Sequence, residues 1–337
     1  MKNNLLFPEK GVFRTIFLYV GQGESTLMII PDGDDHKYVL IDSNIDEERG
    51  GILLDDFLKD IKNKGLIFIN THPHNDHTRG LKSIKELVKE IWHSGHKPGK
   101  EHDDSYKEME GVMKDIGDKN VFYLRGTCDL NTVHTDREEK SKTVKKIGDV
   151  DFQVFSPAKY VCDDIAGEDP EARSRRIHEQ CGVIKFTYKD KSILLTGDSD
   201  KTAWKESIKA YYEDNLKSEV LSASHHGSRS FFKDGEDDKD VYEEHIEAIG
   251  PEYLIISAPK QKDSLHDHPH DDALDLYKKH IEEGNIFHLG VKGESVVADI
   301  DSNGNLTISD EEIDKTSESD VIFRTSGASR PYFPNAN

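Results

Sequence analysis

Short apolar runs broken by Gly, Pro and Asp fill the first part of the chain. Their β-branched and aromatic side chains predict strands at about 12–20, 25–30, 38–41 and 65–70. A helix is expected at about 52–62. A second helix is predicted at 80–90, where Leu81, Ile84 and Leu87 recur at helical spacing.

The rest of the chain alternates between the same two patterns. Further strands are predicted at 121–124, 150–155, 182–188, 192–196, 219–224, 253–258 and 286–289. Further helices are predicted at 104–116, 200–212, 239–249 and 271–283. A hairpin is expected at Asn303-Gly304, because Asn-Gly favours a tight turn. This alternation predicts two sheets packed together with helices outside.

Polar segments divide this pattern without suggesting a second domain. We expect one domain over residues 1–310, with insertions at about 125–150 and 158–180, followed by a polar tail at 311–337. The insertion at 158–180 is a candidate lid over a site. The first residues lack a signal-peptide pattern, and no run is long and apolar enough to span a membrane.

The formal charge of the chain is −21, from 45 Lys and Arg against 66 Asp and Glu. An acidic surface argues against broad, nonspecific binding of nucleic-acid backbone, which depends on basic side chains. It does not exclude a small cationic site, because bound metal ions add local positive charge. Three scattered cysteines, Cys128, Cys162 and Cys181, argue against a disulfide framework. We therefore expect a cytoplasmic protein.

The segment at 71–77, Thr-His-Pro-His-Asn-Asp-His, is the most specific motif of the chain. Imidazole and carboxylate are the ligands that zinc and similar divalent cations prefer. In an extended segment, His72, His74 and Asp76 point to one side, and His77 can turn inward where the chain bends. The motif follows a predicted strand, at the end where α/β sheets commonly bind ligands. Unrelated surface histidines are a weaker explanation of this spacing.

Later residues could complete a centre with two metals. Asp198 follows a buried strand and a Gly that allows close approach, so its carboxylate could bridge two cations, although Gly-Asp is also a common turn. His178 precedes the strand at 182–188, and a solvated histidine is the alternative there.

Two further groups of histidines follow. His225 and His226 end another predicted strand, where neighbours face opposite sides, so we expect one of them to bind metal and the other to contact substrate. His266, His268 and His270 precede a predicted helix, whose N-terminus favours anions. An exposed polar loop is the alternative for these three residues.

Taken together, this order of ligands resembles the metallo-β-lactamase fold of metallohydrolases. More narrowly, four segments resemble the hydrolase domain at the C-terminus of ComEC-type DNA-uptake proteins. These are Tyr19-Val20-Gly21-Gln22-Gly23-Glu24-Ser25, the motif at 71–77, Ser224-His225-His226-Gly227-Ser228 with the following Arg229 and Ser230, and His268-Pro269-His270. The chain departs from that family at Tyr19 and Glu24, where Asp is common, and at His178, which fits the wider fold better.

The resemblance implies a four-layer αββα sandwich with two divalent cations, zinc or manganese. His72, His74 and His178 would hold one ion; Asp76, His77 and one of His225 and His226 would hold the other, and we assign His225 as this ligand. Asp198 would bridge the two ions. Asp76 would orient the attacking hydroxide, while His226 and His268 would stabilise the oxyanion or protonate the leaving group.

These expectations describe a metal-dependent hydrolase, most simply a phosphodiesterase or nuclease acting on a nucleic acid or nucleotide. The same metal chemistry also supports hydrolysis of a carboxylic ester or lactone. From a different class, the chain could be an effector or regulatory module of a multi-protein system, with its acidic surface facing protein partners.

Overall fold

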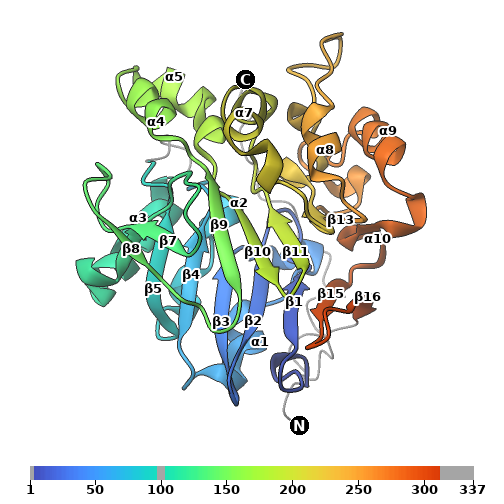
Figure 1. Cartoon of the computed structure of the whole chain (residues 1–337). Helices are drawn as coiled ribbons and strands as arrows, with labels where there is room; N and C mark the ends of the chain where they lie inside the picture. The colour runs from blue at the N-terminus through green and yellow to red at the C-terminus, as the bar shows by residue number, and fades with distance from the viewer. Residues whose placement is uncertain (1–3, 97–102, 312–337) are drawn as a thin grey trace.

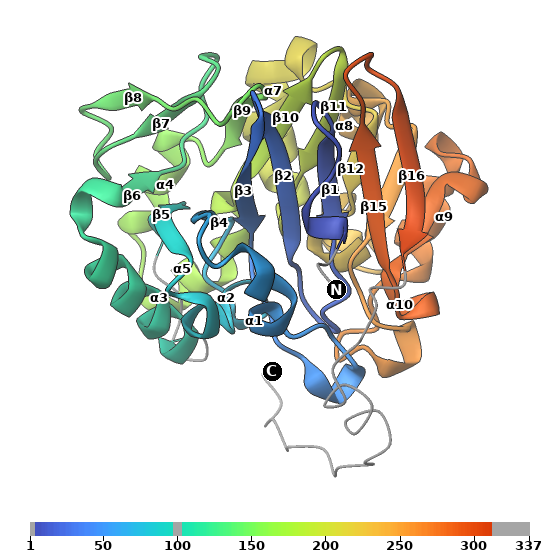
Figure 2. The ribbon, with the colours of Figure 1, turned by 90° about the horizontal axis from the view of Figure 1, so that it is seen from below.

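Two β-sheets pack face to face, and helices cover the outer side of each (Figures 1 and 2). The computed structural model describes residues 4–96 and 103–311. The predicted α/β sandwich of four layers is confirmed. The predicted tail lies outside the described residues apart from Glu311, which ends the last strand.

The first sheet has ten strands in the order β16-β15-β1-β2-β3-β4-β5-β6-β7-β8. Its strands from β3 to β6 run parallel, and the remaining pairs are antiparallel. The bounds are β1 (Phe13–Phe17), β2 (Thr26–Asp32), β3 (Asp35–Ile41), β4 (Leu66–Asn70), β5 (Val88–His93), β6 (Val121–Tyr123), β7 (Thr132–His134), β8 (Lys142–Val144), β15 (Ser295–Ile300) and β16 (Leu306–Glu311). The predicted hairpin at Asn303-Gly304 joins the last two.

The second sheet has six strands in the order β14-β13-β12-β11-β10-β9. Strands β9 to β11 are antiparallel, and β11 to β14 are parallel. The bounds are β9 (Asp151–Ser156), β10 (Val183–Tyr188), β11 (Lys191–Leu195), β12 (Val220–Ser222), β13 (Tyr253–Ile256) and β14 (Ile286–His288).

Within the described residues, ten α-helical segments join these strands. Their bounds are α1 (Leu54–Phe57), α2 (Asn75–Thr78), α3 (Asp103–Ile116), α4 (Lys159–Ala166), α5 (Pro170–Arg175), α6 (Lys201–Ala203), α7 (Lys209–Tyr212), α8 (Glu244–Ile249), α9 (Asp271–His280) and α10 (Leu289–Lys292). A π-helical turn over Trp204–Ile208 joins α6 to α7, so the helix predicted at 200–212 is present. Across residues 4–96 and 103–311, none of the helices has the length and apolar character needed to cross a bilayer.

Three apolar cores follow from the four layers. The central core lies between the sheets and includes Phe17, Trp92, Phe152 and Phe186. A second core packs α1 and α3 against the outer face of the first sheet, and a third packs α8 and α9 against the outer face of the second. In Figure 2 these helices lie on opposite sides of the paired sheets. Burial on both faces explains the nearly continuous apolar runs in the parallel strands.

The prediction of a helix at 80–90 is wrong. Only a short 3-10 turn, Leu81–Ile84, is helical, and Val88 begins β5. β5 pairs in parallel with β4 and continues through two fully buried residues, Ile91 and Trp92. The apolar stripe at 81–88 therefore belongs to a turn and a strand start. Strand pairing in the sheet outweighs a helical spacing that covers only two turns.

The two polar insertions also carry structure. The segment at 125–150 contains β7 and β8, which extend the edge of the first sheet. The segment at 158–180 forms α4, α5 and the 3-10 turn η7 (Ile177–Gln180). In Figure 1, α4 and α5 lie at the upper end of the sheets. The turn η7 carries His178, so this segment contributes to the site directly. Its role as a lid stays a prediction.

Candidate metal centre

The loop after β4 brings most of the predicted ligands to the carboxyl end of that strand. Asn70, the last residue of β4, holds the loop through its side-chain amide, which donates to the backbone oxygens of His72 and His77 at 2.8 and 3.1 Å. The backbone is extended at His74 and becomes helical at Asn75, where α2 begins. The expected alternation thus holds for His72 and His74, whereas Asp76 turns with α2 toward other ligands.

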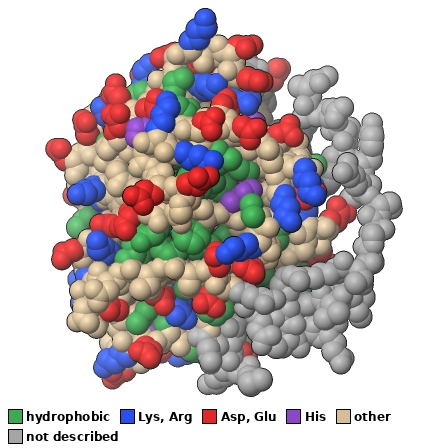
Figure 3. All heavy atoms as spheres, turned by 90° about the vertical axis from the view of Figure 1, so that its right-hand side faces the viewer, with side chains coloured by type: hydrophobic (Ala, Val, Ile, Leu, Met, Phe, Trp, Pro, Cys, Tyr) green, Lys and Arg blue, Asp and Glu red, His purple; other side chains and the backbone are tan. Residues whose placement is uncertain are grey.

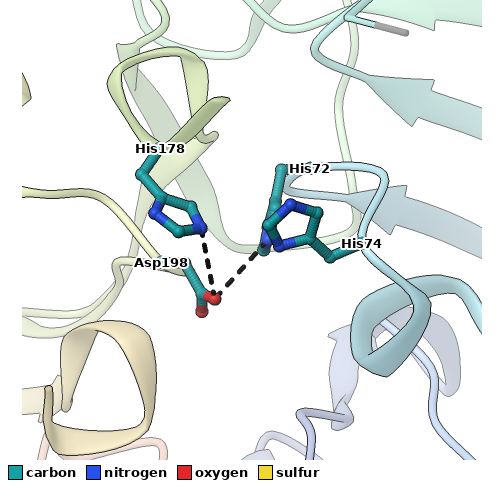
Figure 4. Close-up of side chains that lie close together, drawn as sticks. All are labelled: His72, His74, His178 and Asp198. Carbon is teal, nitrogen blue, oxygen red and sulfur yellow. Dashed lines mark ion pairs between the residues drawn. The ribbon is translucent and has the colours of Figure 1, made fainter. Parts of the chain in front are cut away.

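We define the first ligand group as His72, His74, His178 and Asp198, whose ligand atoms all lie within 4.8 Å of one another. Figure 4 shows His178 approaching Asp198 from one side and His72 from the other. The Oδ2 atom of Asp198 lies 3.5 Å from Nε2 of His72 and 3.9 Å from Nε2 of His178. Both of these imidazole nitrogens are buried without a hydrogen-bond partner.

We define the second ligand group as Asp76, His77 and His226. The Nε2 atom of His226 lies 3.3 Å from Oδ2 of Asp76 and 3.2 Å from Nε2 of His77. Both imidazoles are almost completely buried, and Asp76 is partly exposed. Two residues of this group come from α2, and His226 comes from the turn after β12.

Asp198 lies between the two groups. Its Oδ2 atom faces His72 and His178, and its Oδ1 atom lies 3.1 Å from Nε2 of His77. The preceding residue, Gly197, has φ +48°, and a Cβ there would lie 2.6 Å from the Sγ atom of Cys181. The expected need for glycine at this close approach is confirmed. One carboxylate oxygen toward each group is the arrangement that a bridging ligand requires.

Hydrogen bonds behind the ligands set the imidazole tautomers. Asp42, at the end of β3, accepts from Oγ1 of Thr71 at 2.6 Å and from Nδ1 of His77 at 2.7 Å. Because the Thr71 hydroxyl gives its proton to Asp42, it accepts from Nδ1 of His72, 3.2 Å away. Nδ1 of His226 donates to the carbonyl of Ser257 at 2.8 Å. All three imidazoles therefore turn Nε2 toward Asp198, as ligating histidines do.

This arrangement fits divalent cations. Lone pairs on Nε2 of His72, His77 and His226 face carboxylate oxygens across a buried space, and acceptors facing acceptors repel unless a proton or a cation lies between them. Donors of this kind, imidazole and carboxylate without thiolate, suit zinc and manganese. The residues present therefore fit two adjacent cation sites.

The electrostatics of the two groups differ. Burial, helped by the neighbouring His77, lowers the pKa of His72 well below its usual range. Burial also opposes the charged forms of His77 and His226, but the carboxylates outweigh it. Asp198 and Asp42 raise the pKa of His77 well above its usual range, and Asp198 and Asp76 raise the pKa of His226 to about 9.

The positions of His225 and His226 correct one prediction. Both residues have left-handed backbone, with φ +50° and +57°, so they occupy a tight turn and not a strand. Both rings consequently face the site, contrary to the expectation that they point to opposite sides. The structure groups His226, instead of His225, with Asp76 and His77. His225 lies nearer the first group, with Nε2 3.6 Å from Oδ2 of Asp198.

Of the three late histidines, His268 is the one that lies against the centre. It is buried, and its ring centroid is 5.1 Å from that of His225. Burial lowers the pKa of His268 to about 3, so the ring is neutral at physiological pH. It can therefore donate a hydrogen bond but cannot supply a proton as an imidazolium. His266 is exposed, and Nδ1 of His270 accepts from the backbone N–H of Arg229 at 3.1 Å.

Two buried carboxyl groups were not predicted as part of the site. Asp42 orients both ligand groups, as described above. Glu24 lies within ligand distance of His77 and Asp198, and burial raises its pKa to about 7. The signal used for Asp198, an acid directly after a buried strand, also marks Asp42 after Val39-Leu40-Ile41. For Glu24, the sequence offered one indication only: Glu24 stands where ComEC-type domains commonly have Asp.

One protein-family model matches part of the chain. The model of the Metallo-beta-lactamase superfamily matches residues 18–156, which include β2 to β9 and the motif at 71–77. No curated protein matches the chain by sequence. None of the matches named below concerns the narrower resemblance to ComEC-type domains.

Similar solved structures are distant. The metallo-β-lactamase fold protein YhfI from Bacillus subtilis is 12% identical, with a TM-score of 0.41, over 82% of this chain and 95% of that chain. Tm1679, titled a metal-dependent hydrolase of the β-lactamase superfamily, is 14% identical, with a TM-score of 0.39 and the same coverage. Zn²⁺-bound PqqB from Methylobacterium extorquens is 8% identical, with a TM-score of 0.38, over 82% and 97%.

Proposed function

Because the chain has the metallo-β-lactamase fold, whose members are generally metal-dependent hydrolases, we propose that it is a phosphodiesterase that uses two divalent cations. The observation that carries this proposal is the position of Asp198, which presents one carboxylate oxygen to each ligand group. Paired cation sites suit phosphodiesters, since the attacking and leaving oxygens can be stabilised together. The resemblance of the motifs to ComEC-type hydrolase domains supports the same substrate class.

Divalent cations bound here would lower the pKa of water and stabilise charge on the reacting oxygens. His72, His74 and His178 would hold one ion, Asp76, His77 and His226 the other, and Asp198 both. Zinc is the expected metal, and manganese is the alternative. The donor set contains no thiolate and does not decide between them.

Three side chains then act on the substrate and the water. Asp76 is ionised, because His226 and His77 outweigh burial and hold its pKa well below the usual range. It can therefore accept a hydrogen bond from the attacking water and orient it. His268, neutral and buried beside His225, would donate a hydrogen bond to an oxygen that gains charge. His225, which stands between His178 and His268, would contact the substrate.

The surface favours small or single-stranded substrates. On the face in Figure 3, acidic and basic side chains are interspersed and form no broad cationic patch. Together with a formal charge of −21, this predicts weak, salt-sensitive capture of long duplexes. Short oligonucleotides and nucleotides should be cleaved better.

The test is hydrolysis of bis-(4-nitrophenyl) phosphate and of short DNA and RNA oligonucleotides by protein loaded with zinc or manganese. We expect cleavage that a chelator abolishes, and a loss of about 10²- to 10³-fold in turnover for His268→Ala with metal content unchanged. Asp118→Ala, which removes an exposed carboxylate before β6, is the control. Hydrolysis of 4-nitrophenyl acetate or a lactone, without phosphodiester cleavage under either metal, would move the function to the ester class. No hydrolysis of any of these by metal-loaded protein would favour a regulatory module.

A further inference from the structure

His268 differs from His77 and His226 in how its ring is held. Nδ1 of His226 donates to the carbonyl of Ser257 at 2.8 Å, and Nδ1 of His77 donates to Asp42 at 2.7 Å. Within residues 4–96 and 103–311, Nδ1 of His268 has no hydrogen-bond partner, although the side chain is buried. A partner on one ring nitrogen usually fixes the orientation of a functional imidazole. The position of the His268 ring therefore depends on its packing and on its backbone.

Ser264 holds the backbone of His268. Its Oγ atom accepts from the backbone N–H of His268 at 3.0 Å and from that of His266 at 3.3 Å. A hydroxyl has two lone pairs and one proton, so these two bonds leave Ser264 only its proton to give. That proton goes to Oε1 of Gln22, 2.9 Å away. The side-chain oxygen of Gln22 therefore sets the direction in which the lone pairs of Ser264 point.

Gln22 is itself fixed against the first sheet. It is 7% exposed and lies in the loop between β1 and β2. Its backbone N–H donates to the carboxylate of Asp46 at 2.9 Å, and its backbone carbonyl accepts from the side-chain amide of Asn44 at 2.6 Å. A Cβ on the next residue, Gly23, would lie 2.5 Å from the backbone oxygen of Asp76, so this loop packs directly against α2. Gln22 is thus a fixed acceptor beside the second ligand group.

The bond from Ser264 to Gln22 crosses between the two sheets. The loop that carries Ser264 joins β13 to α9 in the second half of the chain. The same loop makes another crossing, because Oγ of Ser257 donates to the backbone oxygen of Gly23 at 2.9 Å. The carbonyl of Ser257 is the acceptor for His226, whose ring centroid is 6.1 Å from that of His268. One loop therefore holds both histidines, and it is fastened to the other sheet beside each of them.

We propose that Gln22 is a positioning residue for His268 and acts through the hydroxyl of Ser264. This deepens the proposed function and rests on it for the role of His268 as a donor to the substrate. Gln22 itself touches no reacting atom. Loss of its side-chain oxygen leaves the Ser264 hydroxyl free to rotate, which weakens the bond to the backbone of His268 and lets an unanchored ring shift. A shift of about 1 Å is enough to slow turnover when a donor must meet a developing charge.

The first test is the kinetics of bis-(4-nitrophenyl) phosphate hydrolysis by zinc-loaded full-length protein, with and without His268→Ala. Gln22→Met removes the acceptor, Ser264→Ala removes the hydroxyl, and Ser264→Thr keeps it. Ser264 is partly exposed, so its variants provide the same test if Gln22→Met fails to fold. Gln153→Met is the matched control, because Gln153 is a buried residue of β9 whose amide donates to the backbone oxygen of Thr127 at 3.0 Å.

We expect kcat to fall about ten-fold in Gln22→Met and in Ser264→Ala, the size of one hydrogen bond, with KM and metal content unchanged. Ser264→Thr and Gln153→Met should keep wild-type turnover. In the His268→Ala background, Gln22→Met and Ser264→Ala should have no further effect, because the side chain that they position is gone. An unchanged kcat in both variants, or a ten-fold loss that persists in the His268→Ala background, would overturn the proposal.

A second test does not depend on the substrate. In zinc-loaded protein with labelled histidines, the nuclear magnetic resonance signal of the His268 ring is assigned by its absence from His268→Ala. It should move in Gln22→Met and in Ser264→Ala and stay in place in Ser264→Thr, while the signal of His134 on β7 is the internal reference. If the wild type cleaves no phosphodiester but the His268 signal moves as expected, the positioning role stands and the proposed function fails. A His268 signal that is the same in wild type, Gln22→Met and Ser264→Ala would overturn the positioning role even in an active phosphodiesterase.

Discussion

The two ligand groups of the centre differ in what they hold before any cation binds. In the first group, Nε2 of His72 and of His178 are buried and unpartnered, and burial lowers the pKa of both residues. In the second, His77 and His226 share their environment with Asp42, Asp76 and Asp198, and their pKa values are raised. In the first group, His72 and His178 are therefore neutral and have free lone pairs on Nε2. In the second group, His77 and His226 are protonated.

This difference shows how one carboxylate, that of Asp198, can contribute to two cation sites. The single negative charge of Asp198 lies closer to the second group than to the first. Its Oδ1 atom is 3.1 Å from Nε2 of His77, whereas its Oδ2 atom is 3.5 Å or more from Nε2 of His72 and of His178. A cation would bind the first group directly at its unpartnered imidazole nitrogens. Binding to the second group would displace protons from His77 and His226.

The largest effect is expected for Asp198→Ala, which removes the residue common to both groups. Wild-type protein should carry about two ions of zinc or manganese per chain, and the variant should lose most of its metal because both groups lose the carboxylate that they share. Metal analysis of purified protein measures this. Retention of the full metal content in Asp198→Ala would show that the two groups are independent of Asp198.

Single histidine variants should separate the groups. His178→Ala should remove about one ion by opening the first group, and His226→Ala should remove about one ion from the second. His270→Ala, a histidine outside both groups, is the matched control. If His225→Ala removes an ion and His226→Ala does not, the original assignment of His225 stands and the grouping by geometry is incorrect. If His178→Ala retains metal while only substrate affinity falls, His178 acts as a lid residue.

A smaller effect is expected for Asp42→Asn, which keeps the shape behind the ligands but removes a negative charge. His77 loses the acceptor that fixes its tautomer, so metal affinity of the second group should fall about 10- to 100-fold. The first group should change less, because Thr71 can still hold Nδ1 of His72. Stepwise metal titration distinguishes the two sites. An equal loss in both would mean that Asp42 supports the whole loop and not one ligand.

The smallest effect is the release of protons on metal binding. At pH 7 the metal-free protein holds protons on His77 and His226, because both folded-state pKa values are raised, to about 9 for His226. A cation must displace them, so affinity should rise with pH and the release from His226 should vanish above pH 9. Calorimetry in buffers of different ionisation enthalpy should detect about one proton or more per chain at pH 7. Binding heats that do not depend on the buffer at pH 7 would contradict the raised pKa values.

The local part of the site could be read from the sequence, and the long-range part could not. His72, His74, Asp76 and His77 were identified because their spacing places them in one loop whatever the rest of the chain does. The structure groups His226, instead of His225, with Asp76 and His77, because the two histidines occupy a turn with left-handed backbone and not the expected strand. Asp42 was missed because its partners, Thr71 and His77, are 29 and 35 residues away.

The elements of the fold also differ in how well the sequence alone predicts them. Strands and helices with long, regular patterns were predicted well, and the order of layers followed from their alternation. The segment at 80–90 was predicted wrongly because a short apolar stripe suits a turn plus a strand as well as a helix. Only pairing with β4 decides between them, and pairing is not visible in a window of eleven residues.

The ligands of the centre come from both sheets: the motif loop follows β4 of the first sheet, and Asp198 and His226 follow β11 and β12 of the second. Bound cations would therefore act as cross-links between the two halves of the sandwich, at the end where the central apolar core stops. Such links exist only in the folded chain, so metal binding adds directly to the free energy of unfolding. The metal centre would then also hold the two sheets together, and chelation should lower the free energy of unfolding of the whole sandwich.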